Sequence, residues 1–167
     1  MVEPLYDVWL EAQEGVATRT QLEGVGFTRG EVRAHIEGGR WRELNDHVLV
    51  MHNGPLTWRQ QMWAAYLSAP GPVALCGLTS MWQWDIRGFE KAEVHLLVPR
   101  GARPLAAAGV SIVVHESRRF SAADIVHGRT PPTTTLSRAT VDAAASTWSE
   151  HVEPPGDTRG ASPHFTR

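Results

Sequence analysis

Two arginines four residues apart could make specific contacts to nucleic acid. Arg29 and Arg33 lie in the segment TRGEVRAHIEGG, and on a helix this spacing places both side chains on one face. Guanidinium groups hydrogen-bond guanine bidentately in the major groove of DNA and also contact phosphates. The small neighbours Gly30 and Ala34 would let the backbone approach a duplex. The pattern indicates a recognition helix, although two arginines on one helix face are equally typical of a surface that meets only solvent.

The helix that carries these arginines has clear sequence signals at both ends. Thr28 is an N-cap residue, and Glu31, three residues later, completes a capping box. Two glycines at 38–39 end the helix. Val32 and Ile36 are four residues apart and should face inward. Because a helix N-terminus carries partial positive charge, a phosphate is expected beside Thr28.

The elements around this helix predict a small DNA-binding fold. Apolar residues at helical spacing predict a first helix near 5–14, and Thr and Gly signals predict a second near 19–24. The third helix would cover 28–38. The segment RWRELNDHVLVMH predicts a hairpin within 40–52 that turns at Asn45-Asp46. Three helices followed by a hairpin is the order of a winged helix-turn-helix.

Further basic residues would hold the phosphate backbone. Arg40 and Arg42 flank a tryptophan at the root of the predicted wing, and His47 lies near its tip. The loop from Arg100 to Arg103 adds positive charge in the second half of the chain. We expect these residues to position the protein on DNA, and Thr28 with the two helix arginines to read bases.

The second half of the chain mixes helical and strand patterns. A capped helix is predicted over 57–69, a shorter one around LTSMWQW, and a last one over 136–146. The runs at 93–98 and 110–115 are short and rich in β-branched residues, so they should pair as strands of one small sheet. The segment from Asp124 to Pro132 reads as irregular.

These patterns together predict an α+β protein, a winged helix-turn-helix followed by a small mixed helix and sheet domain. The predicted units are 1–54 for the winged helix and 55–149 for the second domain, with Asn53-Gly54-Pro55 between them. Residues 150–167 are Pro-, Gly- and polar-rich without periodicity, which predicts a mobile tail.

The charge balance weighs against strong DNA binding by the first unit. The whole chain has 16 basic and 18 acidic side chains, a net charge of −2. Residues 1–54 contain five arginines and nine carboxylates, whereas residues 55–150 contain nine basic and seven acidic side chains. If DNA is the partner, the second half should supply part of the attraction to phosphate.

Several runs along the sequence resemble a known protein family. The run GVATRTQLEGVGFTRGEVRAHIEGGRWRELNDHVLVMH, followed by LTWRQQMWAAYLSAPGPVALCGLTSMWQW, EVHLLVPRGARP, GVSIVVHES and TTTLSRATVDAAA, is similar to actinobacterial AbiEi-type antitoxins of type IV toxin–antitoxin systems. The resemblance implies a winged helix that binds the promoter of its own operon, and a second domain that acts against a nucleotidyltransferase-like toxin. Many members continue into a restriction-endonuclease-like domain, which we do not expect here. The matching positions are Thr28, Arg29 and Arg33 in the recognition helix and Arg40 and Arg42 in the wing.

Catalytic chemistry is not expected from the residues present. A nuclease needs clustered carboxylates and a lysine around a metal ion. The only lysine is Lys91, and the nearby acids Asp85, Glu90 and Glu93 lack the usual acid-x-Lys order. No nucleophile motif or phosphate-binding loop is present. We therefore expect neither an enzyme nor a bound cofactor.

Metal binding and membrane insertion are also not expected. None of the eight histidines pairs at helical i, i+4 spacing, and Cys76 is the only cysteine. His95 and His115 lie in strand-like runs, where a half-buried, hydrogen-bonded imidazole is the common case. No run of 18 apolar residues occurs, and the N-terminus lacks signal-peptide order. A cytoplasmic protein is expected.

Two functions remain after these exclusions. The first is a DNA-binding transcriptional regulator, an AbiEi-like antitoxin that represses its own operon through double-stranded promoter DNA. The alternative is a protein-interaction module that docks on a toxin or another partner without significant DNA binding. The acidic first unit favours the alternative, and the arginine spacing favours DNA. The sequence leaves the oligomeric state open.

Overall fold

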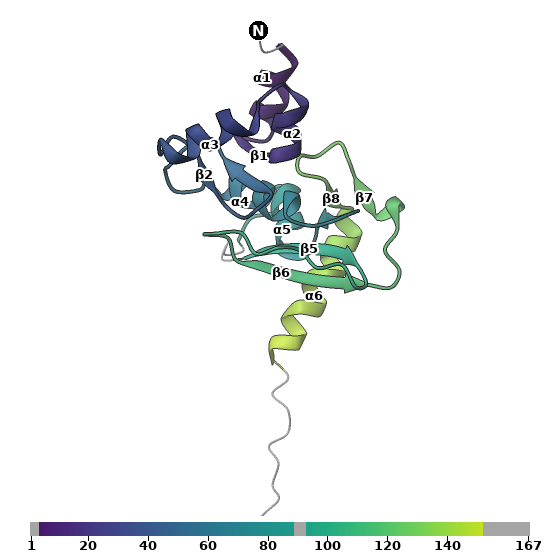
Figure 1. Ribbon diagram of the computed structural model, residues 1–167. Helices are drawn as coiled ribbons and strands as arrows, with labels where there is room; N and C mark the ends of the chain where they lie inside the picture. Colours follow the sequence, from purple (N-terminus) through teal and green to yellow (C-terminus); the bar gives the residue numbers. More distant parts are fainter. Residues whose placement is uncertain (1–3, 89–92, 152–167) are drawn as a thin grey trace, which may run out of the picture.

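The computed structural model of the protein describes residues 4–88 and 93–151, and over this range the chain has an α+β fold (Figure 1). In chain order the elements are α1 (Pro4–Ala12), β1 (Val16–Thr18), α2 (Arg19–Gly24), α3 (Arg29–Glu37), β2 (Arg42–Glu43), β3 (Val48–Val50), α4 (Trp58–Leu67), β4 (Ala74–Leu75), α5 (Gly77–Gln83), β5 (Val94–Pro99), β6 (Ile112–Ser117), the 3₁₀ helix η1 (Ala122–Asp124), β7 (Ile125–Val126), β8 (Thr133–Thr134) and α6 (Leu136–His151). The predicted α+β class is therefore confirmed.

Threonine caps define where three helices begin. Thr18, Thr28 and Thr57 precede α2, α3 and α4, and each hydroxyl accepts the N–H of the residue three positions later. A Gln or Glu at that position bonds back to the cap backbone, which completes a capping box in all three helices. The predicted helices near 19–24 and 28–38 are observed for this reason.

The first sheet contains a strand that was not predicted. Its order is β1-β3-β2, with both pairs antiparallel. The predicted first helix, 5–14, ends two residues early because Glu14 and Gly15 take positive φ angles of 52° and 77° and turn the chain into β1. Three helices and the β2–β3 hairpin occur in the predicted order. The assignment of this unit as a winged helix-turn-helix stays a prediction.

The second sheet has five strands in the order β6-β5-β4-β8-β7. The predicted pair is observed as β5 and β6, which run parallel with Val94 opposite Ile112 and Pro99 opposite Ser117. Parallel strands need a crossover of about a dozen residues, and residues 100–111 provide it without a helix. The segment predicted to be irregular, 124–132, contains β7, which pairs with β8.

Helices cover both faces of this sheet. From α4, Met62 and Ala65 pack against alternate residues of β5, in a core cluster that includes Val94 and Leu96. The other face lies under α5 and α6. Gly77 of α5 packs closely between His95 of β5 and Ala143 of α6, because a Cβ added to it would lie 3.7 Å from His95 Nδ1 and 3.9 Å from the backbone nitrogen of Ala143.

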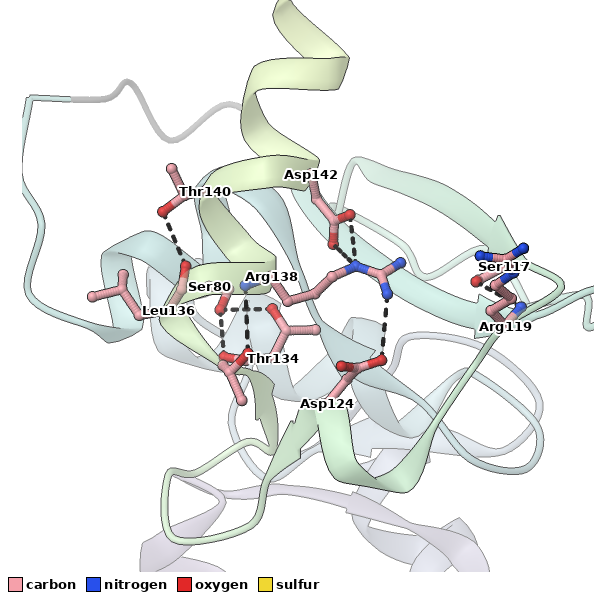
Figure 2. Close-up of polar contacts among 10 residues, drawn as sticks. Ser80, Ser117, Arg119, Asp124, Thr134, Leu136, Arg138, Thr140 and Asp142 are labelled. Carbon is pink, nitrogen blue, oxygen red and sulfur yellow. Dashed lines mark hydrogen bonds and ion pairs between the residues drawn. The ribbon is translucent and has the colours of Figure 1, made fainter.

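An arginine clamp anchors the last helix. Arg138 Nε donates to both carboxylate oxygens of Asp142 at 2.9 and 3.1 Å, and its Nη1 donates to Asp124 at 3.3 Å (Figure 2). The helix continues through His151, so the boundary predicted at residue 150 is too early. Residues 152–167, the rest of the predicted tail, lie outside the described residues.

The two predicted units share one hydrophobic cluster. Val16, Val48 and Val50 from the first sheet pack with Trp63 of α4 and Ala107 of the β5–β6 crossover, and all are buried. Figure 1 shows the first sheet and its helices at one end of the molecule and the β5–β6 pair at the other, with α6 extending away. The predicted boundary between 54 and 55 falls in the short connection before α4.

Candidate nucleic-acid interface

The N-terminus of α3 is occupied by a side chain of its own helix. Thr28 N–H and its hydroxyl both donate to a Glu31 carboxylate oxygen at 2.8 Å, and Glu31 N–H donates to the Thr28 hydroxyl at 3.2 Å. These hydrogen bonds from Thr28 lower the pKa of Glu31. The groups expected to hold a phosphate beside Thr28 are therefore bonded to a carboxylate. The N–H groups of Arg29 and Gly30, in the first turn, are the ones left for an anion.

The two arginines of α3 project into solvent. Their side chains are 91% exposed for Arg29 and 77% exposed for Arg33, whereas Val32 is buried. Each has a carboxylate partner: Arg29 Nε lies 3.0 Å from Glu23 and Arg33 Nε lies 2.7 Å from Glu37. The hydrogen bond to Glu37 raises the pKa of Arg33. Both arginines are thus accessible to a ligand and locally neutralised.

A groove of about 680 Å³ runs between α2, α3 and β2. Val32 and Ile36 contribute its apolar lining. A third pair, Arg19 with Glu43, joins the two α3 pairs around it. The residues that line it are Arg19, Thr20, Glu23, Arg29, Val32, Arg33, Ile36, Glu37 and Glu43. We call this the α3 groove. Its three arginines and three glutamates balance.

The predicted wing residues differ in their surroundings. Arg40 is exposed, and its Nε donates to His35 Nδ1 at 3.0 Å. The His35 ring stacks on Trp41 with centroids 4.1 Å apart and planes 9° apart. Arg42 is half-buried, and its Nε has no hydrogen-bond partner among the described residues. Arg40 is therefore held against the end of α3 by His35, a positioning contact that the sequence did not reveal.

The hairpin turn meets the crossover loop of the second sheet. Asn45 Oδ1 accepts the N–H groups of His47 at 3.0 Å and Val48 at 2.9 Å, which shapes the turn. Asn45 Nδ2 also donates to the Ala106 carbonyl at 3.2 Å. His47 is exposed and lines a small concavity of about 280 Å³ together with Arg103. The structure thus brings one predicted wing residue and one predicted loop residue together.

The predicted basic loop contains one paired and one unpaired arginine. Arg103 is 73% exposed and forms an ion pair with Glu116, whose carboxylate also accepts the N–H of Gly101 at 3.1 Å. These two bonds, with a weaker contribution from Arg100, lower the pKa of Glu116. Arg100 itself is exposed and has no ion-pair partner in the part of the chain that the structure describes.

Two histidines that were expected to be structural lie next to each other away from these surfaces. His95 Nδ1 and His115 Nε2 are 3.0 Å apart across β5 and β6, and the rings stack with centroids 5.2 Å apart. Burial lowers the pKa of His115. Within residues 4–88 and 93–151 no group of three or more His, Cys, Asp or Glu is placed to hold a metal ion.

The acids around the arginines were only partly readable from the sequence. Glu37 follows Arg33 by four residues, a spacing that predicts a helical ion pair. The pairs of Arg29 with Glu23 and of Arg19 with Glu43 join different elements, so no local spacing indicates them. Glu90 and Lys91, considered above as possible nuclease residues, lie outside the described residues.

Neither the comparison with protein families nor that with curated sequences found a relative of the chain: no family model matches it, and no curated protein sequence shows a significant match. No helix in the described ranges is long and apolar enough to cross a membrane. The functional interpretation therefore depends on the surfaces described above.

Proposed function

We propose that the protein is a DNA-binding transcriptional regulator, an AbiEi-like antitoxin that acts in the cytoplasm and represses its own operon. The observation that carries the proposal is α3. It is a capped helix with Val32 buried beneath it and with Arg29 and Arg33 both exposed. A neighbouring helix, α2, and a hairpin, β2–β3, flank it. An exposed helix of this kind suits insertion into a major groove, as a recognition helix does in a helix-turn-helix complex.

The ion pairs on α3 do not prevent base recognition. An exposed pair such as Arg29–Glu23 or Arg33–Glu37 contributes about 0.2–1 kcal/mol. A bidentate contact from arginine to guanine is worth about 1–3 kcal/mol of discrimination. Exchange of a glutamate for a guanine is therefore favourable when the correct base is present, and much less so on a non-specific sequence, where the glutamates would repel phosphate.

A second function is favoured by the neutral charge of the α3 groove. Its apolar lining of Val32 and Ile36, with three arginine–glutamate pairs around it, suits a protein surface that carries both charges. In this alternative the chain docks on a partner protein without binding DNA. A nucleotidyltransferase-like toxin is the partner that the family resemblance implies.

Removal of the two α3 arginines tests the first function. R29A/R33A should weaken binding to the DNA upstream of the protein's own gene by about one to four orders of magnitude, if the two costs of about 1–3 kcal/mol add. Gel-shift titrations at several salt concentrations measure this, because phosphate contacts weaken as salt rises.

The matched variant E23Q/E37Q separates the two functions. It removes the acidic partners and leaves the arginines in place, so DNA affinity should be kept or increased. For a partner protein that uses both charges, the same variant should weaken binding. Equal DNA affinity of wild type and R29A/R33A, or no salt-sensitive DNA binding by either, would contradict the proposal and favour docking.

A further inference from the structure

Within the described residues, three arginines without an ion-pair partner lie at one end of the second sheet. β5 and β6 are parallel, so their carboxyl ends meet at the same edge. Arg100 directly follows β5, and Arg118 and Arg119 directly follow β6. All three are exposed. None of them forms an ion pair within the described residues, which distinguishes them from the arginines of the α3 groove.

The strand register brings these arginines close together. Pro99 is opposite Ser117, and the backbone N–H of Arg100 donates to the Ser117 carbonyl at 3.1 Å. The chains that leave β5 and β6 are therefore about one strand spacing apart, roughly 4.8 Å. The N–H of Arg119 donates to the Ser117 hydroxyl at 3.1 Å, which fixes the turn after β6 (Figure 2).

Among the described residues at these two strand ends, Glu116 is the one carboxylate that offsets the positive charge. Arg103 joins the group through its ion pair with Glu116, so the group contains four arginines and one glutamate. We call Arg100, Arg103, Arg118 and Arg119 the strand-end patch. Within the described residues, the guanidinium groups of Arg100, Arg118 and Arg119 are exposed and have no hydrogen-bond or ion-pair partner, so they are available to an anionic ligand.

The strand-end patch adjoins the proposed wing at Arg103. Arg103 lines the same concavity as His47 of the β2–β3 turn. The carbonyl of His47 accepts the N–H of Arg19 at 2.9 Å, and Arg19 lines the α3 groove. A path of neighbouring residues therefore leads from the helix arginines over the turn to the patch. If α3 lies in the major groove of a duplex, the phosphates that border this groove lie on both sides of the helix and extend to the flanking wing.

We propose that the strand-end patch is a second contact surface for the phosphate backbone of duplex DNA. This inference rests on the proposed function and assigns the non-specific attraction to the second sheet. The α3 groove and the strand-end patch have different roles because their arginines differ in ion pairing. The neutralised arginines of the α3 groove engage DNA only where bases replace their glutamates, whereas the patch attracts any phosphate. The acidic balance of residues 1–54 is thereby offset by residues outside them.

Substitution of two patch residues tests the inference. R118A/R119A removes two positive charges that have no ion-pair partner, so salt-dependent binding to a random-sequence duplex should fall. For two lost phosphate contacts the slope of log K against log salt should decrease by about 1.8, with a loss of about tenfold to a hundredfold in affinity near 0.1 M salt. The loss should be the same on random and upstream DNA.

The control is R59A/R87A, which removes the same charge from exposed arginines elsewhere, paired with Glu14 and Asp85. Its salt slope should match that of wild type, and circular dichroism should show that all variants fold. If R118A/R119A and R59A/R87A lose equally little, the patch is not a DNA contact. If R118A/R119A loses binding while R29A/R33A keeps full preference for upstream DNA, the patch stands and the proposed base recognition fails.

Discussion

Replacement of Ser80 by alanine tests the buried hydroxyl network that joins α5 to β8. Ser80 Oγ donates to the Thr134 carbonyl at 3.1 Å and accepts the hydroxyls of Thr133 at 2.7 Å and Thr134 at 3.0 Å (Figure 2 draws the contacts to Thr134). All three side chains are fully buried. Water cannot replace a lost bond there without a cavity to hold it.

The stability cost of S80A depends on which buried polar groups still have a hydrogen-bond partner after the substitution. After S80A, the Thr133 hydroxyl can still donate to the Leu75 carbonyl at 3.3 Å, and the Thr134 carbonyl still accepts Trp84 Nε1 at 3.0 Å. The Thr134 hydroxyl loses its acceptor, at a cost of about 1–3 kcal/mol, and the bond that Ser80 donates is worth about 1 kcal/mol. S80A should therefore lower the free energy of unfolding by about 2–4 kcal/mol.

A double-mutant cycle isolates the stranded hydroxyl. T134V leaves Ser80 with Thr133 as its donor and should cost about 1 kcal/mol. S80A/T134V removes both partners, so it should cost about 1 kcal/mol less than the sum of the single variants. Urea unfolding followed by tryptophan fluorescence measures all three. Additive effects, or a cost below about 0.5 kcal/mol for S80A, would refute the proposed energetics of the network.

Two other predictions concern the cap of α3 and the histidine pair. T28A removes the hydroxyl that accepts the Glu31 N–H and should lower the free energy of unfolding by about 0.5–2 kcal/mol; urea unfolding should show a smaller effect for T20A, an exposed threonine of α2, and an equal effect would contradict the capping role. Burial lowers the pKa of His115 below its ordinary value of about 6.5, so the unfolded chain takes up the proton first and stability should decline as the pH falls below about 6.5. H115Q should flatten this decline between pH 7.5 and 5.5, and an unchanged decline would assign it to other groups.

The helices of this chain were largely predictable because their signals are local. Thr18, Thr28 and Thr57 each stand three residues before Gln or Glu, and each starts a helix. β1 was missed because three residues between Gly15 and a helix cap show no periodicity, and the strand exists through its pairing with β3. The two-residue strands β7 and β8 were missed for the same reason.

The candidate site was predictable in position but not in charge. Arg29 and Arg33 are exposed on α3 as the spacing indicates. Their neutralisation depends on Glu23, which lies six residues before Arg29 on another helix, and on a side-chain rotamer of Glu37. The strand-end patch was half visible: Arg100 and Arg103 were singled out, whereas only the parallel register places Arg118 and Arg119 beside them.

The cluster shared by the first sheet and α4 bears on the proposed binding to DNA. Trp63 Nε1 donates to the Ala12 carbonyl at 2.9 Å, and Gln60 Nε2 donates to the Glu14 carbonyl at 2.8 Å. Val16, Val48 and Val50 pack beside Trp63, and these contacts oppose hinge motion at the connection 53–55. The proposed base-reading helix and the strand-end patch would then keep a fixed distance and orientation relative to each other. Binding should therefore tolerate a change of the DNA sequence that the patch contacts. It should not tolerate a change of the distance between the two contacted DNA segments, since a few inserted base pairs would turn one segment to the far side of the duplex.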